Sequence, residues 1–302
     1  MNTVFLALLN RSIAASWLIL AVIVLRLLLR RAPKWTRGIL WGLVAIRLIV
    51  PVSLQSVFSL IPSAQTVPTD IEMMAAPAIE SGVAAVDNAV NPLLGAAFAP
   101  TPINSANPLQ IWLPVLSVLW SVGIAAILLY ALVGYIRLRF KVRTAVRDGD
   151  VWMCDNISSP FILGLFRPRI YVPAAPIDRE HVLAHEQAHL RRRDHLTKPL
   201  GFLIAAVFWF NPLVWVAYAL FCKDIELACD EAVIKTLDAD ARADYSEALL
   251  ACSMPRRLLS ACPLAFGEVS VGRRIKNILH YKKPTLWLII AAVLVCGATA
   301  VC

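Results

Sequence analysis

The sequence is poor in charged residues, and one long stretch of it has no basic residue at all. Only 16% of the 302 residues are charged, whereas 59% are hydrophobic, and the mean hydropathy is +0.68. Soluble globular domains carry about 25% charged residues, so this composition excludes an ordinary soluble domain. Residues 53–110 contain neither Lys nor Arg. By the positive-inside rule this stretch is extracellular, and the basic segments that flank it face the cytoplasm.

Cysteines are present but are not arranged as a disulfide framework. Five of the seven fall in the segment that we expect in the reducing cytoplasm, where disulfides rarely persist. Cys229 lies between two acidic residues and resembles a metal ligand, but we interpret it as a small buried apolar residue.

Long apolar blocks, each flanked by basic residues, predict a membrane protein with four transmembrane helices. The predicted organisation is two helices and a basic cytoplasmic loop in 1–52, an extracellular loop in 53–110, a third helix in 111–136, a cytoplasmic domain in 137–283 and a fourth helix in 284–302. The N-terminus is then outside. The extracellular loop lacks periodicity and is expected to be weakly ordered. Anionic lipid, rather than nucleic acid, is the expected partner of the net charge of +9.

The segment from His185 to His189 reads His-Glu-Gln-Ala-His, in a chain with only five histidines. Residues four apart share one face of a helix, so His185 and His189 can bind one Zn²⁺. Glu186 is beside them and can act as general base on the water that the metal activates. The spacing therefore predicts a catalytic zinc site rather than an ordinary amphipathic helix.

A second helix is expected to complete the site. Asn211-Pro212 is a typical helix start, and the helix that follows carries Glu226 and Asp230. Glu226 is the predicted third ligand, which leaves one coordination position open for water. Asp230 is predicted to orient a ligand histidine from the second shell.

The apolar block 200–221 is ambiguous, because a single crossing would place the histidines and Glu226 on opposite sides of the membrane. Asn211-Pro212 divides the block into halves too short to cross, since a span needs ~20 residues. We therefore predict a helical hairpin that returns to the same side.

Short strands and one longer helix are expected in the cytoplasmic domain. The strands are Val151–Cys154, Phe161–Leu163 and Arg169–Val172. The histidine helix is expected to start at Pro176 or Asp178 and to continue to about Leu196. An edge strand beside this helix would suit a peptide substrate, but a small sheet that only packs on the helix fits equally well.

Two residues near the end of the predicted histidine helix, Asp194 and His195, also resemble metal ligands. A residue five or six positions beyond His189 lies more than one turn away from it. We therefore expect these two side chains to cap the helix or to form salt bridges.

These features together resemble the BlaR/MecR-type membrane metallopeptidases, the antirepressor regulators of β-lactam resistance and their bacterial relatives. The matching segments are 160–173 (Pro-Phe-Ile-Leu-Gly-Leu-Phe-Arg-Pro-Arg-Ile-Tyr-Val-Pro), 185–194, 209–215 and 226–231. The resemblance implies a gluzincin fold in a bacterial cell membrane, with His185, His189 and Glu226 as zinc ligands and Glu186 as catalytic base. It also implies a cytoplasmic protein substrate, typically a winged-helix repressor, and self-cleavage. The antibiotic sensors of the family carry a penicillin-binding domain after the last span, whereas this sequence ends at Cys302 in apolar sequence, so the sensor is absent or the chain is a fragment.

The sequence therefore predicts a mainly α membrane protein with a cytoplasmic α+β gluzincin-like domain that contains a small sheet. The predicted function is a zinc endopeptidase that cleaves a cytoplasmic protein, a repressor or itself, in signal transduction. Arg273-Arg274 is the predicted site of self-cleavage. The alternative is a non-catalytic signal transducer that uses the zinc fold as a docking module. The sequence leaves a homo-oligomer open.

Overall fold

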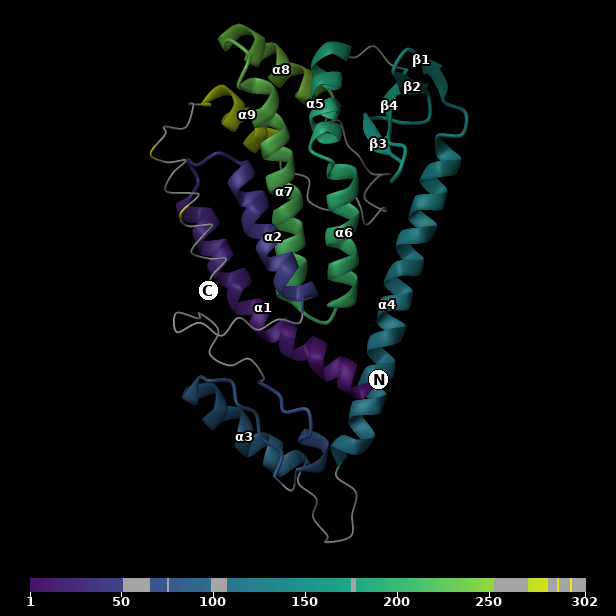
Figure 1. Cartoon of the computed structure of the whole chain (residues 1–302). Coiled ribbons are helices and arrows are strands. Elements are labelled where there is room, and N and C mark those ends of the chain that lie inside the picture. Colours follow the sequence, from purple (N-terminus) through teal and green to yellow (C-terminus); the bar gives the residue numbers. More distant parts are fainter. Residues whose placement is uncertain are drawn as a thin grey trace.

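A computed structural model describes residues 1–50, 66–74, 76–98, 108–174, 178–252 and 271–281, together with Trp287 and Leu294. These residues form a mainly helical protein with one four-stranded mixed sheet (Figure 1). The predicted mainly α class with a small sheet is confirmed. The number of membrane spans is not.

Within the described residues, two helices are long and apolar enough to cross a membrane, α1 (Asn2–Leu28) and α4 (Pro108–Lys141). At 1.5 Å per residue they are ~40 and ~51 Å long, against a hydrocarbon core of ~30 Å. α2 (Trp35–Ile49) reaches only ~22 Å, and its expected continuation to residue 52 lies outside the described residues. The expected fourth span, 284–302, also lies outside them apart from Trp287 and Leu294.

The long helix α4 exposes apolar side chains along most of its length. Only Leu113 and Ser117 of this helix are buried, whereas Ile111 and Leu129 are 65% and 61% exposed. An apolar surface of this extent on water-soluble proteins marks an interaction site. Together with its hydropathy, this surface indicates contact with lipid.

The main core lies between α1, α2, α6 (Asp194–Val207) and α7 (Pro212–Ile234). α6 and α7 run side by side in opposite directions, joined by the short turn at 208–211 (Figure 1). Asn211 caps α7 by accepting a hydrogen bond from the Leu213 amide at 2.9 Å, as its sequence predicts. Its amide nitrogen also donates to the Ser12 and Ser16 hydroxyls of α1. The turn is therefore anchored inside the helical bundle.

The segment that we expect to be extracellular contains more structure than the sequence predicts, so the expectation of weak order is wrong for residues 66–74 and 76–98. A 3₁₀ turn (Ile71–Met73) and α3 (Ala84–Phe98) occur there. Ile71 is buried with Phe5 and Leu6 of α1, and Asn10 exchanges two hydrogen bonds of 2.8 Å with the Val67 backbone. These contacts come from distant helices, so local periodicity does not reveal them.

The sheet has the strand order β1-β2-β4-β3. The strands are β1 (Val146–Asp148), β2 (Val151–Cys154), β3 (Phe161–Leu163) and β4 (Arg169–Pro173). The last three occur where the sequence predicts them, whereas β1 was not expected. β3 and β4 form an antiparallel hairpin. The edge strand β3 packs against α5.

The histidine helix is shorter than the sequence predicts. α5 (Arg179–Arg191) ends five residues before Leu196, and its start is capped by the Asp178 side chain. Arg193 adopts a left-handed φ of 59°, which an α-helix cannot continue through. The chain therefore changes direction, and Asp194 opens α6. Two further helices are α8 (Ala239–Cys252) and α9 (Val271–Leu279). α8 packs against α5, and α9 packs against α7 (Figure 1).

Candidate metal centre

Three of the predicted site residues meet between α5 and α7. His185 and His189 follow one another on the buried face of α5, each 6% exposed, with ring centroids 4.8 Å apart. On α7, Oε2 of Glu226 lies 3.6 Å from Nε2 of His185, and Oε1 lies 3.6 Å from Nε2 of His189. The carboxylate thus faces the same nitrogen of both rings.

The geometry of these three residues fits a zinc ion. Their ligand atoms all lie within 4.8 Å of one another. Zinc bonds of ~2.0–2.2 Å in a tetrahedron separate neighbouring ligand atoms by ~3.3–3.6 Å. The observed 3.6 Å separations need almost no rearrangement, and two imidazoles with one carboxylate form a donor set typical of catalytic zinc.

The Glu226 carboxylate is held in its ionised form. Burial alone would raise its pKa, but Lys198 and His189 lower that pKa well below its ordinary value. Lys198 Nζ donates to Oε1 at 2.8 Å, and an Arg274 nitrogen lies 3.7 Å from Oε2. Burial lowers the pKa of His189, and Glu226 outweighs this effect and raises it well above its ordinary value. Cationic side chains therefore supply positive charge beside the Glu226 carboxylate. A bound metal ion would supply charge of the same sign at this position.

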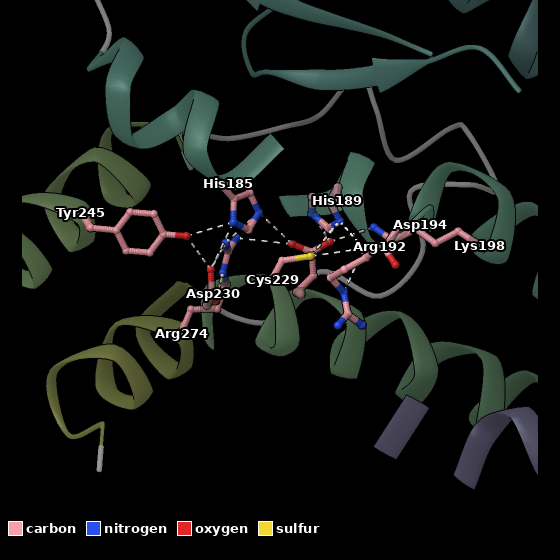
Figure 2. Close-up of polar contacts among 10 residues, drawn as sticks. His185, His189, Arg192, Asp194, Lys198, Cys229, Asp230, Tyr245 and Arg274 are labelled. Carbon is pink, nitrogen blue, oxygen red and sulfur yellow. Dashed lines mark hydrogen bonds and ion pairs between the residues drawn. The ribbon is translucent and has the colours of Figure 1, made fainter. Parts of the chain in front are cut away.

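Tyr245 of α8 sets the orientation of His185 (Figure 2). Its hydroxyl lies 2.9 Å from His185 Nδ1 and donates to Asp230 Oδ1 at 2.9 Å. Burial and the Asp230 charge raise the pKa of Tyr245, so the phenol keeps its proton. A hydroxyl has one hydrogen to donate, so it accepts from His185 Nδ1, and the lone pair of Nε2 points to Glu226. Asp230 therefore acts on the histidine mainly through Tyr245, and its own oxygen lies 3.4 Å from Nδ1.

His189 is oriented by Asp194, the first residue of α6. Asp194 Oδ2 lies 2.8 Å from His189 Nδ1, so the ring donates there and presents Nε2 to Glu226. Cys229, which is fully buried, places its sulfur 3.2 Å from both groups. Burial raises the pKa of its thiol to about 11, and the protonated thiol donates to Asp194. The predicted salt-bridge role of Asp194 matches its contact with His189.

Arg274 connects α9 to the candidate metal centre. Its guanidinium forms a two-pronged contact with Asp230, with distances of 2.8 and 2.7 Å. One of the same nitrogens lies 3.2 Å from His185 Nε2, the atom that a metal would use. Sequence reasoning missed Arg274, Tyr245 and Lys198, because their partners are 28 to 89 residues away in the chain.

Glu186, the predicted base, directly follows His185 on α5 and is 9% exposed. The adjacent histidines are turned toward Glu226 by the contacts described above. Glu186 is therefore buried on α5, as the two candidate histidine ligands are.

Comparison with known proteins places this arrangement in a family. The BlaR1 peptidase M56 family matches residues 6–278. This chain belongs to that family. It is 33% identical over 135 residues to the regulatory protein BlaR1 of Bacillus licheniformis. The aligned region covers 42% of this chain and 22% of that relative. It is 27% identical over 157 residues to the methicillin resistance mecR1 protein of Staphylococcus aureus. That aligned region covers 47% of this chain and 27% of the relative.

Family membership makes the chain a metallopeptidase-type protein. With its two long apolar helices, membership also indicates a membrane protein. The aligned segments span about a quarter of the length of these curated relatives.

Replacing Tyr245 with Phe is expected to weaken zinc binding ~10–100-fold, as removal of outer contacts to ligand histidines does. The change deletes one oxygen, which leaves His185 Nδ1 without its acceptor but keeps the buried ring. Competitive zinc titration of the purified protein measures the affinity. Tyr281→Phe is the matched control, because Tyr281 lies under Arg242 and is not among the hydrogen-bond partners of the candidate ligands in the described residues. Equal zinc affinity in wild type and Tyr245→Phe would show that Asp230 orients His185 without the phenol.

Proposed function

We propose that this chain is an integral-membrane zinc endopeptidase that cleaves a cytoplasmic protein as a step in signal transduction. The observation that carries the proposal is the convergence of His185, His189 and Glu226 with their ligand atoms within 4.8 Å. Each histidine also has an acceptor at Nδ1, the arrangement that presents Nε2 to a metal.

The chemistry divides between the ion and the chain. Bound zinc would act as a Lewis acid that polarises the scissile carbonyl and lowers the pKa of water toward ~7. Glu186 takes the proton from the attacking water and delivers it to the leaving amine. Lys198 and Arg274 keep Glu226 ionised. Asp194 and Tyr245 hold the two imidazoles in one tautomer.

The proposed topology keeps the metal centre in the cytoplasm. The N-terminus and residues 53–110 are outside, and four spans, including 284–302, cross the membrane. The hairpin of α6 and α7 enters from the cytoplasmic side and returns to it. Its turn at 208–211 is seated among α1 residues through Asn211. This arrangement keeps the histidines and Glu226 on one side.

The proposed substrate is a winged-helix repressor, which fits relatives named as a regulatory protein and a methicillin resistance protein. A substrate peptide in extended form can add to the edge strand β3. Among the described residues β3 pairs with one strand only, and it packs against the histidine helix. A peptide added at this edge would therefore run beside α5, the helix that carries His185 and His189.

Self-cleavage at Arg273-Arg274 requires a conformational change. Both residues lie inside α9, and Arg274 is held by Asp230 and lies 3.2 Å from His185 Nε2. A peptide bond has to be extended to be cut, so α9 must unwind and Arg274 must leave Asp230 first. We therefore propose cleavage of another protein as the primary activity.

Metal removal tests the proposal. The purified full chain is expected to contain one zinc per protein and to cleave a winged-helix repressor taken from a neighbouring reading frame. Chelation is expected to stop cleavage, and added zinc to restore it. Metal content is measured by atomic emission, and cleavage by mass spectrometry of the fragments. Bound zinc with an uncut repressor that still co-purifies would indicate the docking module instead.

A further inference from the structure

An apolar groove runs between α2, α6 and α7. It encloses a cavity of about 280 Å³, close to the smaller ligand pockets of proteins, which start at ~300 Å³. We propose that this groove binds an acyl chain of an anionic phospholipid from the cytoplasmic leaflet, with the phosphate between Lys34 and Arg192. The proposal does not rest on the proposed activity, but the groove adjoins the candidate metal centre, because Asp194 lines its polar end and also contacts His189.

The groove exists because small residues leave space along α2. Gly38 and Gly42 are one helical turn apart on the lining face. A Cβ added at either position would meet nothing within 4 Å. Gly201 of α6 lies on the opposite wall. The space is therefore not filled by side chains of the described residues.

Polarity changes along the length of the groove. The charged lining residues are Lys34, Arg192, Asp194 and Asp224. They stand where α2 and α6 begin and in the second half of α7, all at one end. Toward the other end the walls are apolar, with Leu48, Ile204 and Val214. Lys34 and Leu48 are separated by ~21 Å along the helix, so the groove has the shape and polarity of an amphiphile.

The two acidic residues at the polar end already have partners in the protein. Asp224 accepts hydrogen bonds from Arg26 and Arg37, and Asp194 from His189. The basic residues are less well satisfied. Arg192 Nε is buried and makes no hydrogen bond within the described part of the chain, with Asp194 Oδ2 at 3.5 Å.

Lys34 is the other basic residue that lines the polar end of the groove. Its Nζ donates to the Arg30 carbonyl at 2.8 Å, while burial and the nearby Arg37 charge lower its pKa. An anion at this position would stabilise the protonated amine.

A phospholipid matches these features better than a helix does. Basic pockets between membrane helices on the cytoplasmic side bind anionic head groups, and Arg30 and Arg31 add further positive charge beside Lys34. A second copy of the chain would offer an apolar helix surface to the groove but no phosphate to Lys34 and Arg192. We therefore commit to the lipid.

Native mass spectrometry of the delipidated full chain tests the site, with phosphatidylglycerol and phosphatidylcholine as probes. Wild type is expected to bind one phosphatidylglycerol in preference to phosphatidylcholine and to gain thermal stability from it. Lys34→Gln with Arg192→Gln is expected to weaken phosphatidylglycerol binding about 25-fold, since each basic residue contributes ~5-fold. Gly42→Leu fills the groove and is expected to abolish binding while both charges remain.

Arg137→Gln with Arg139→Gln is the matched control, because it removes two exposed charges of α4 outside the groove. The control variant is expected to bind like wild type. Zinc content and thermal midpoint report whether each variant is folded.

Several outcomes would overturn the proposal. They are equal binding of the two lipids, the same loss in the control, unchanged binding in Gly42→Leu, or a shift produced equally by inorganic phosphate. A concentration-dependent dimer that Gly42→Leu disrupts, without lipid selectivity, would assign the groove to a second copy instead.

Discussion

Glu186→Gln is expected to keep zinc bound and to lower the rate of repressor cleavage by ~10²–10⁴-fold, the usual contribution of a general base. The substitution keeps the size of the side chain but removes the group that accepts the proton. The substitution leaves His185, His189 and Glu226 unchanged. The Nδ1 contacts of the two histidines, to Tyr245 and Asp194, remain. Zinc content and fragment formation, measured on the same preparation, separate the two effects.

Glu180→Gln is the matched control for this experiment. It removes the same charge from the same helix α5, at an exposed position in the first turn. Activity is expected to stay at the wild-type level. Full cleavage by Glu186→Gln would remove Glu186 from the mechanism, whereas loss of zinc from that variant would assign it a structural role.

Asp224→Ala is expected to destabilise the fold by ~3–5 kcal/mol, the range for removing one partner of a buried ion pair. Asp224 is 2% exposed and accepts hydrogen bonds from Arg26, Arg37 and Trp41 at 2.6, 2.8 and 2.9 Å. Without the carboxylate, two largely buried guanidinium groups lose their counter-charge. The network also ties α7 to α1 and α2 only two residues before Glu226.

Asp148→Ala provides the comparison, because Asp148 pairs with Arg179 at a similar distance of 2.9 Å but both side chains are about half exposed. An exposed pair contributes only ~0–1 kcal/mol, so this variant is expected to unfold like wild type. Unfolding of both variants in detergent, with zinc content as a second readout, gives the difference. Equal stability of wild type and Asp224→Ala would mean that water or lipid compensates the arginines.

Local patterns were sufficient for most elements. The strands β2, β3 and β4, the helix start at Asn211-Pro212 and the turn between α6 and α7 occur where alternation, capping and turn residues predict them. Patterns failed where a distant contact decides the conformation. α5 ends at Arg191 because Arg193 is left-handed, and the 3₁₀ turn Ile71–Met73 is held in place by burial of Ile71 against α1 and α4.

The candidate site shows the same division. Spacing on one helix suggested His185, Glu186 and His189, and spacing on another suggested Glu226 and Asp230. The structure adds Tyr245, Lys198 and Arg274 around them, and it gives Asp194 its partner, His189. The route from Asp230 to His185 through Tyr245 has no counterpart in the sequence, because α8 and α7 are brought together only by folding.

The order of residues along the chain determined by itself the apolar helices, the metal-binding spacing and the charge asymmetry, because helical periodicity and hydropathy act over a few neighbouring residues. Only the tertiary structure decided which ring nitrogen faces Glu226 and which cations surround that carboxylate. It alone also decided where a groove stays open beside α2. These features depend on side chains from helices distant in sequence, whose relative positions are set by packing of the whole core.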